Sequence, residues 1–488
     1  MRPVFLLIFL FSLCLSLIAV FALIPENVTF GPFHIKTFDF VGWVSEFGSR
    51  PAEQKINTGK LLSLQSETDK LALLDSGAQT AGMADSLSGL DRPDLDFHLD
   101  SSAGIQFPNG DSSLFQSFFR GLDSAGKGNN VVRILHFGDS QIENDRITGY
   151  LRQRFQQSYG GIGPGMLPFY EETPTRISVE INSSKKARRY FLYGKSVPAK
   201  HNKYSVLHSL FHLQRDTATL DPKSKQTFTY QLKNSGFRRS SSFERATFLF
   251  RNPVSKLRIS SPSFSKDKLE WTSPPSDSLK TLVWQTGGKK KSISIEVEGN
   301  SENDFYGVCL DGLNGVAVDN IPLRGSSGLE FLKINPRFLQ DQIRRLNVKM
   351  VILQFGVNVV PYDSPSYFWY ENNMVRVIQT LKKADPDLQV LVIGVSDMAK
   401  KTGGQWQSYP NIDAIRKAQK NAAFRTKSGF WDLYEVMGGK NSIVAWAGTS
   451  PALAGKDYIH LTPRGAQVVG EFLFQALEKI KKHPSTGI

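Results

Sequence analysis

Along the chain, continuous apolar runs alternate with segments whose apolar positions recur every three to four residues. The continuous runs predict buried strands at Val131–Phe137, Gly315–Val318, Val348–Phe355, Leu388–Val395 and Gly429–Tyr434. The helical spacing predicts helices at Ile142–Phe155, Leu329–Leu346 (with a break near Pro336), Tyr370–Lys383, Ile412–Thr426 and Gly465–Lys481. This repeated alternation of strand and helix indicates an α/β domain whose parallel sheet is covered on both faces.

The pattern changes between about Ile177 and Gly299, where short alternating or aromatic runs are separated by clusters of Pro, Ser, Asn and Gly. Several short strands at this spacing predict a β-sandwich, and Gly287-Gly288 predicts a hairpin turn within it. Because the α/β pattern resumes afterwards, we expect an inserted β-rich domain at 171–304. The α/β domain then comprises 113–170 and 305–482.

The N-terminus carries the longest apolar run, Val4–Ile24, which has 21 residues without a charge and follows Arg2. It predicts either an export signal, with Val20-Phe21-Ala22 as the cleavage site, or a single membrane anchor. Both place the chain after it outside the cytoplasm, in the periplasm or another extracytoplasmic space, with inner-membrane anchoring as the alternative. Residues 25–112 show no sustained periodicity, and we expect an extension or linker there.

Composition narrows the range of partners and cofactors. The net charge is +14, which favours anionic partners such as acidic glycans or lipid head groups. The chain lacks zinc-finger spacing, an aromatic RNA-binding signature and a long Arg-rich tract, so we expect no nucleic-acid partner. The two cysteines, Cys14 and Cys309, provide neither a disulfide in the body of the chain nor a Cys-based zinc site. We expect no metal and no cofactor.

Two short motifs far apart in the chain supply complementary chemistry. Gly138-Asp139-Ser140 ends the first predicted strand, and Asp457-Tyr458-Ile459-His460 follows about 320 residues later, just before the last predicted helix. A hydroxyl, an imidazole base and an orienting carboxylate form the minimum set for acyl transfer through a covalent ester. The simpler alternatives are a helix N-cap for Ser140 and a surface loop for the second motif.

Two further segments follow strands and carry groups that can stabilise an oxyanion. Asn358 comes after Val348–Phe355, and its amide N–H can donate to a developing negative charge; the alternative is an ordinary turn residue. A glycine within 320–328 allows a backbone N–H to approach a substrate oxygen closely. All these groups lie at the carboxyl ends of successive strands, where open α/β sheets bind ligands.

Other polar residues near Ser140 have a structural interpretation. Glu143 and Asp145 lie at the start of a predicted helix, where its dipole favours acidic groups. His136 lies on the predicted strand, and we expect a core histidine whose hydrogen bonds are satisfied.

The order Gly-Asp-Ser, Gly, Gly-x-Asn, Asp-x-x-His resembles the SGNH hydrolase superfamily, also called GDSL-type esterases and lipases. The resemblance implies a flavodoxin-like three-layer fold, with Ser140 as nucleophile, His460 as general base and Asp457 as its orienting carboxylate. It also implies an oxyanion hole formed by the backbone N–H groups of Ser140 and Gly325 and the Asn358 side chain, with Gly328 as the alternative glycine. Gln141 departs from the family pattern, in which many relatives carry Leu after the nucleophile.

The β-rich insert is similar in architecture to that of bacterial peptidoglycan O-acetylesterases, in which it resembles a carbohydrate-binding module. Together with the predicted export and the basic net charge, the resemblance leads us to expect an exported serine esterase that removes short acyl groups, in the first place acetyl, from an envelope or extracellular glycan or from a small ester. An O-acetyltransferase of an envelope polysaccharide and a non-catalytic glycan-binding envelope protein are the alternatives.

Overall fold

The structure is a computed structural model of the 488-residue chain, and it separates into two compact units, Met1–Lys55 and Ile56–Ile488. It describes residues 27–30, 33–36, 104–128, 130–171, 175–184, 187–192, 198–213, 223–233, 235, 237–263, 269–300 and 302–486. In the first unit, β1 (Asn27–Phe30) and β2 (Phe33–Lys36) form an antiparallel pair. The predicted signal or anchor at Val4–Ile24 lies outside the described residues.

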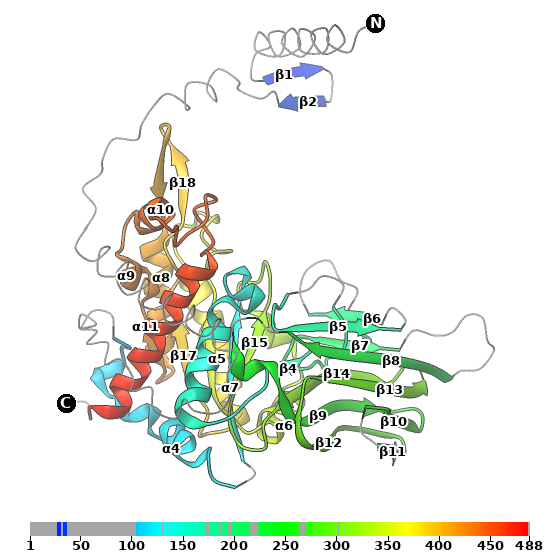
Figure 1. Ribbon diagram of the computed structural model, residues 1–488. Helices are drawn as coiled ribbons and strands as arrows, with labels where there is room; N and C mark the ends of the chain where they lie inside the picture. The colour runs from blue at the N-terminus through cyan, green and yellow to red at the C-terminus, as the bar shows by residue number, and fades with distance from the viewer. Residues whose placement is uncertain are drawn as a thin grey trace, which may run out of the picture. The chain divides into compact units, whose positions relative to one another are not determined.

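The centre of the second unit is a five-stranded sheet in which every neighbouring pair is parallel (Figure 1). Its strands are β3 (Val131–Gly138), β15 (Gly315–Pro322), β16 (Val348–Gln354), β17 (Gln389–Ile393) and β20 (Gly429–Trp431). The spatial order is β15-β3-β16-β17-β20. Numbered by position in the chain this is 2-1-3-4-5, the flavodoxin-like order, in which ligands bind where the order reverses, beside the first strand.

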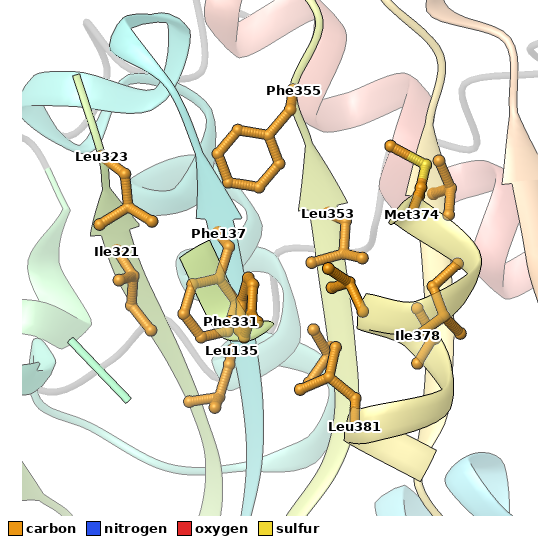
Figure 2. Close-up of a cluster of buried hydrophobic side chains, with 14 of the residues drawn as sticks. Leu135, Phe137, Ile321, Leu323, Phe331, Leu353, Phe355, Met374, Ile378 and Leu381 are labelled. Carbon is orange, nitrogen blue, oxygen red and sulfur yellow. The ribbon is translucent and has the colours of Figure 1, made fainter. Parts of the chain in front are cut away.

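The strands of this sheet are apolar on both faces, since successive side chains point to opposite sides. Leu135 and Phe137 of β3 belong to the core on one face, and Val132 and Ile134 belong to the core on the other. The first core includes side chains of α6 (Pro336–Arg345), α7 (Phe368–Ala384) and α8 (Ile412–Arg425). Figure 2 shows Met374, Ile378 and Leu381 of α7 directed toward the strand that carries Leu353.

The second core includes side chains of α4 (Gln116–Ser124), α5 (Arg146–Tyr159), α9 (Leu433–Met437), α10 (Ser442–Gly448) and α11 (Pro463–Lys482). The result is a helix–sheet–helix arrangement. The predicted mixed α/β fold with a parallel sheet is confirmed. In the described part of the chain, no helix combines the length and the apolar content that a bilayer crossing requires.

Between α5 and β15 the chain forms two antiparallel sheets whose facing side chains make a third core (Figure 1). One sheet has the order β11-β10-β13-β8-β5: Leu269–Ser273, Leu257–Ser261, Ser292–Asn300, Lys223–Leu232 and Val179–Ser183. The other has the order β12-β9-β14-β7-β6: Ser276–Lys290, Phe243–Asn252, Asp304–Asp311, Ser209–His212 and Arg188–Phe191, with β4 (Gly165–Leu167) paired to β14. These strands extend beyond the expected limits of 171–304 at both ends.

Several glycines lie where the chain passes between the α/β part and these sheets. A Cβ added at Gly163 would lie 2.1 Å from the carbonyl oxygen of Leu310, and one at Gly315 would lie 2.2 Å from the nitrogen of Gly161. Both glycines have positive φ values, 96° and 92°. The glycine-rich segment after α5 is thus a helix end and a loop in which backbone segments pack closely.

Two local predictions were wrong. Gly287-Gly288 is not a hairpin turn, because both residues lie inside β12, at a register shift between Gln285 and Lys290 relative to β9. The glycines, with φ values of 65° and 143°, allow the strand to bulge there, and the following strand joins the other sheet. The strand predicted at Gly429–Tyr434 ends at Trp431, because the side chain of Asp432 caps α9.

The end of the expected extension packs on the α/β part. Gln106 forms two backbone hydrogen bonds with Phe430 of β20, 2.7 and 2.9 Å long, and Phe107 is buried. This single bridge covers the edge of the sheet at β20.

Candidate active site

The candidate site lies at the carboxyl ends of β3, β15 and β16. Ser140 follows β3 and begins a short 3-10 segment, Ser140–Asp145, that leads into α5. Asp139 caps this segment, because its carboxylate accepts the N–H of Gln141 at 3.0 Å. Because β3 is the strand at which the sheet order reverses, Ser140 lies at the position where open α/β sheets bind ligands.

The structure brings together the three residues from the two distant motifs. The distance between Ser140 Oγ and His460 Nε2 is 2.7 Å, and the distance between His460 Nδ1 and Asp457 Oδ2 is also 2.7 Å. An ionised carboxylate accepts hydrogen bonds only, so Nδ1 carries the proton and Nε2 is left to accept the Ser140 hydroxyl proton. This chain of contacts can transfer a proton from the hydroxyl to the imidazole.

A tight turn before α11 holds the imidazole and the carboxylate. Asp457 Oδ1 accepts the backbone N–H groups of Ile459 and His460, each at 3.1 Å, and Gly455 N donates to the carbonyl of His460 at 2.8 Å. Partial burial acts to raise the pKa of Asp457, but the hydrogen bonds from the His460 side chain and these backbone groups outweigh it and lower the pKa. The carboxylate therefore stays ionised and orients the ring.

A threonine side chain caps the start of α11. The Thr462 side chain accepts the N–H of Gly465, and Pro463 is the first helical residue.

The candidate oxyanion groups come from the loops after β15 and β16. The segment that follows β15 runs beside the end of β3, because Leu323 N donates to the carbonyl of Gly138 at 2.7 Å. Gly325 follows two residues later with a φ of 79°, and there is open space around its Cα. The amide Nδ2 of Asn358 donates to the carbonyl of Ser326 at 3.0 Å, so the loops carrying Asn358 and Gly325 are joined.

The geometry distinguishes the two candidate glycines. Gly328 N–H already donates to Ser326 Oγ at 2.9 Å, and a Cβ there would lie 2.5 Å from the ring of Phe355. Gly328 is therefore a packed turn residue, and Gly325 is the glycine with space beside its backbone.

Gln141 contributes in a way that sequence reasoning missed. Its side chain is buried, and it donates from Nε2 to the carbonyl of Ile459 at 2.6 Å and accepts the N–H of Leu461 at 3.4 Å. Nε2 also contacts Ser396 Oγ at 3.4 Å. The residue after Ser140 thus holds the backbone on both sides of His460. The only signal in the sequence was the unusual Gln in the Gly-Asp-Ser motif.

A second missed contact is the ion pair between Glu143 and Arg324. Arg324 Nε and Nη2 donate to the two carboxylate oxygens of Glu143, each at 2.7 Å. Glu143 belongs to the segment that begins at Ser140, and Arg324 directly precedes Gly325. The pair therefore links two loops of the candidate site in a two-pronged geometry that fixes orientation as well as distance.

The remaining polar residues near Ser140 have structural roles. His136 is buried between Gln354 Oε1 and Thr148 Oγ1, each 3.0 Å from a ring nitrogen, and burial lowers its pKa to about 4. The prediction of a core histidine with satisfied hydrogen bonds is confirmed. Asp145 pairs with Arg152 at 3.2 Å. In the described ranges, no group of three or more His, Cys, Asp or Glu residues is placed to hold a metal ion.

Comparisons with known proteins give a family match for part of the chain. Residues 286–468 match the model of the GDSL-like lipase/acylhydrolase family, a range that includes Gly325, Asn358, Asp457 and His460. Ser140 precedes this range, on the other side of the β-rich insert. No curated protein matches the chain.

A solved peptidoglycan O-acetylesterase is 16% identical and aligns with 78% of this chain and 99% of its own, with a TM-score of 0.61. This likeness shows a common fold. An acetyl xylan esterase is 18% identical over 33% of this chain and 81% of its own, with a TM-score of 0.26. A family two carbohydrate esterase from Cellvibrio japonicus is 9% identical over 62% of this chain and 99% of its own, with a TM-score of 0.24. Likeness at these two scores carries no structural argument.

The family match, the parallel sheet with its flavodoxin-like order and the loops at the carboxyl ends of its strands agree with one another. Residues 286–468 carry a GDSL-like lipase/acylhydrolase domain, and the chain is a carboxylic ester hydrolase.

Proposed function

We propose that the protein is a serine esterase that removes acetyl groups from a glycan, with Ser140, His460 and Asp457 as its catalytic triad. The observation that carries the proposal is the 2.7 Å contact between Ser140 Oγ and His460 Nε2, with Nδ1 of the same ring on Asp457. The fold shared with a peptidoglycan O-acetylesterase supports a sugar-bound acetyl ester as substrate.

The contacts lead to a two-step reaction. His460 Nε2 takes the proton of Ser140 as Oγ attacks the ester carbonyl, and the tetrahedral intermediate collapses when the same proton passes to the leaving sugar hydroxyl. A water molecule then gives its proton to His460 and attacks the acetyl-serine ester. Collapse of the second intermediate returns a proton to Ser140 Oγ and releases acetate.

The negative oxygen of each intermediate needs donors that are already in place. We assign this role to the backbone N–H groups of Ser140 and Gly325 and to the Asn358 amide, which has a second N–H besides the one on Ser326. Loss of one donor of this kind typically lowers the rate about 10²–10³-fold.

Hydrolysis is favoured over transfer to another sugar because the base is open to water. The His460 and Asp457 side chains are 34% and 48% exposed. A transferase has to keep water from its acyl-enzyme, and this arrangement does not cover the imidazole that would activate water.

We also propose that the enzyme acts outside the cytoplasm, as an exported or membrane-anchored protein. The support is the uncharged run at Val4–Ile24, together with a net charge of +14 that suits the acidic polymers of an envelope.

Replacement of the nucleophile tests the proposal. Ser140→Ala should lower kcat for p-nitrophenyl acetate at least about 10³-fold and should stop acetate release from O-acetylated peptidoglycan, because the covalent step is lost. Ser124→Ala, which changes an exposed serine of α4, is the matched control and should retain full activity. A fluorophosphonate should label the wild type at Ser140. Equal turnover by wild type and Ser140→Ala would refute the proposal.

A further inference from the structure

The large aromatic side chains that are exposed in the described part of the chain come from two segments, one that follows Asn358 in the chain and one in a short hairpin. They are Tyr362, Phe368, Trp369 and Trp406, which are 36–73% exposed. The first three follow Asn358 within eleven residues, and Trp406 lies on the hairpin formed by β18 (Ala399–Thr402) and β19 (Gln405–Ser408). Trp406 has the contacts that relate it most directly to the candidate triad.

Hydrogen bonds fix the hairpin at both of its ends. At the first, Ala399 N donates to the carbonyl of Tyr458 at 3.1 Å. At the second, Ser408 N donates to Asn441 Oδ1 at 3.0 Å, and Asn441 N donates to Ser408 Oγ at 2.7 Å. The hairpin stands out beyond α10 (Figure 1), and one of its two anchors is the turn that carries His460.

Trp406 lies against Tyr458, one of the two residues between Asp457 and His460. Its ring centroid is 4.4 Å from that of Tyr458, at an interplanar angle of 36°. Tyr458 has a φ of 54°, an unfavourable conformation for a tyrosine, which the surrounding turn maintains. An indole that is still 36% exposed is therefore held against Tyr458, which lies two residues before His460 in the chain.

The chemistry of this surface favours a sugar ring as its ligand. A pyranose offers a face of C–H groups that packs on an aromatic ring, while its hydroxyls stay in water. An acyl chain requires a concave apolar groove, but the hairpin residues around Trp406 are polar and exposed, among them Lys400, Lys401 and Gln405. The lysines also suit a polymer that carries carboxylates.

We infer that Trp406, supported by Tyr458, forms a subsite that binds a sugar unit of the glycan next to the unit whose ester is cleaved. This inference rests on the proposed function and extends it, because it assigns the recognition of a polymer to the α/β part of the chain. The subsite acts on binding, whereas Ser140, Asp457 and His460 act on the bond that breaks.

Kinetics of the full chain on a polymer and on a small ester test the subsite. Trp406→Ala should raise KM for O-acetylated peptidoglycan about tenfold, a change that corresponds to about 1.4 kcal/mol of binding. The loss in kcat/KM on the polymer should exceed the loss on p-nitrophenyl acetate at least about fivefold. Trp406→Phe, which keeps a ring, should recover most of the affinity. Gln405→Ala, on the opposite face of the same hairpin, is the matched control.

The outcomes separate the subsite from the proposed function. If wild type hydrolyses p-nitrophenyl acetate but Trp406→Ala has the wild-type KM for the polymer, the subsite is wrong and the esterase proposal stands. If wild type hydrolyses neither substrate, the esterase proposal fails. Calorimetric binding of de-O-acetylated glycan strands to Ser140→Ala, with and without Trp406→Ala, then decides the subsite. A selective loss on p-nitrophenyl palmitate would assign the ring to an acyl chain and overturn the inference.

Discussion

Gln141 joins the segments that carry Ser140 and His460, the proposed nucleophile and base, through contacts outside the candidate triad. Its side chain bonds to the carbonyl before His460 and the N–H after it, and its own backbone follows Ser140. A shift of the 457–460 turn would therefore break hydrogen bonds inside a buried pocket, where polar groups left without partners cost about 1–3 kcal/mol each. We assign Gln141 as a positioning residue for His460.

The variant Gln141→Leu tests this assignment. We expect kcat for p-nitrophenyl acetate to fall about 10–100-fold with a smaller change in KM, because a displaced base slows proton transfer more than it weakens binding. The rate of Ser140 labelling by a fluorophosphonate should fall in parallel. Gln405→Leu makes the same change on the exposed hairpin and should have little effect. Wild-type kcat in Gln141→Leu would contradict the assignment.

At the residue scale, the sequence predicted the chemical groups but missed what holds them in place. Ser140, Asp457 and His460 were recognisable because each motif is short and lies at a predicted strand or helix end. The partners of Gln141 lie 318 and 320 residues away, and Arg324 lies 181 residues from Glu143, so no local pattern could reveal these contacts.

At the scale of elements, the sequence predicted the strands and helices that contribute long apolar faces to a core. It missed the strands that are exposed. The strands of the parallel sheet are buried on both faces, which produces long apolar runs. The β18–β19 hairpin, AKKTGGQWQS, has almost no buried side chains, so its sequence shows no apolar alternation. Gly287-Gly288 has the composition of a turn, yet tertiary pairing with β9 keeps it inside a strand.

The link between the loops after β3 and β15 leads to a prediction about Arg324. Arg324→Leu should lower kcat several-fold, because the Gly325 N–H loses its fixed distance from Ser140. The free energy of unfolding should fall by about 1–3 kcal/mol, because the Glu143 side chain is only 8% exposed and its carboxylate would be left buried without this cation. Arg345→Leu, which breaks an exposed Arg–Asp pair on α6, is the matched control in kinetics and thermal unfolding. Equal kcat in the two variants would show that the ion pair does not position Gly325.

At the scale of the whole molecule, a buried histidine lies where the β-rich insert meets the α/β part. His208 comes directly before β7, and its ring centroid is 5.6 Å from Phe137 and 4.3 Å from Phe331, two rings that Figure 2 shows together in the core. Within the described residues neither of its ring nitrogens has a hydrogen-bond partner, and burial lowers its pKa to about 3.

This histidine should make the protein sensitive to acid. Above pH 6.5 the His208 ring is neutral in both the folded and the unfolded chain. Below pH 6.5 the ring binds a proton in the unfolded chain, whereas in the folded chain it stays neutral down to about pH 3. The free energy of unfolding should therefore fall by about 2 kcal/mol more in wild type than in His208→Leu between pH 7 and pH 5. Urea unfolding at both values measures this. His483→Leu, at an exposed histidine, should keep the wild-type pH dependence, and an equal pH dependence in His208→Leu would contradict the prediction.

The 320-residue separation between Ser140 and His460 has a consequence for biosynthesis. The ribosome makes Ser140 before the β-rich insert and before four of the five strands of the parallel sheet, and it makes His460 after all of them. In the proposed mechanism, every nascent chain that stops short of His460 lacks its base. Ester cleavage by the proposed triad therefore begins only after His460 has emerged from the exit tunnel and its turn has docked on Gln141.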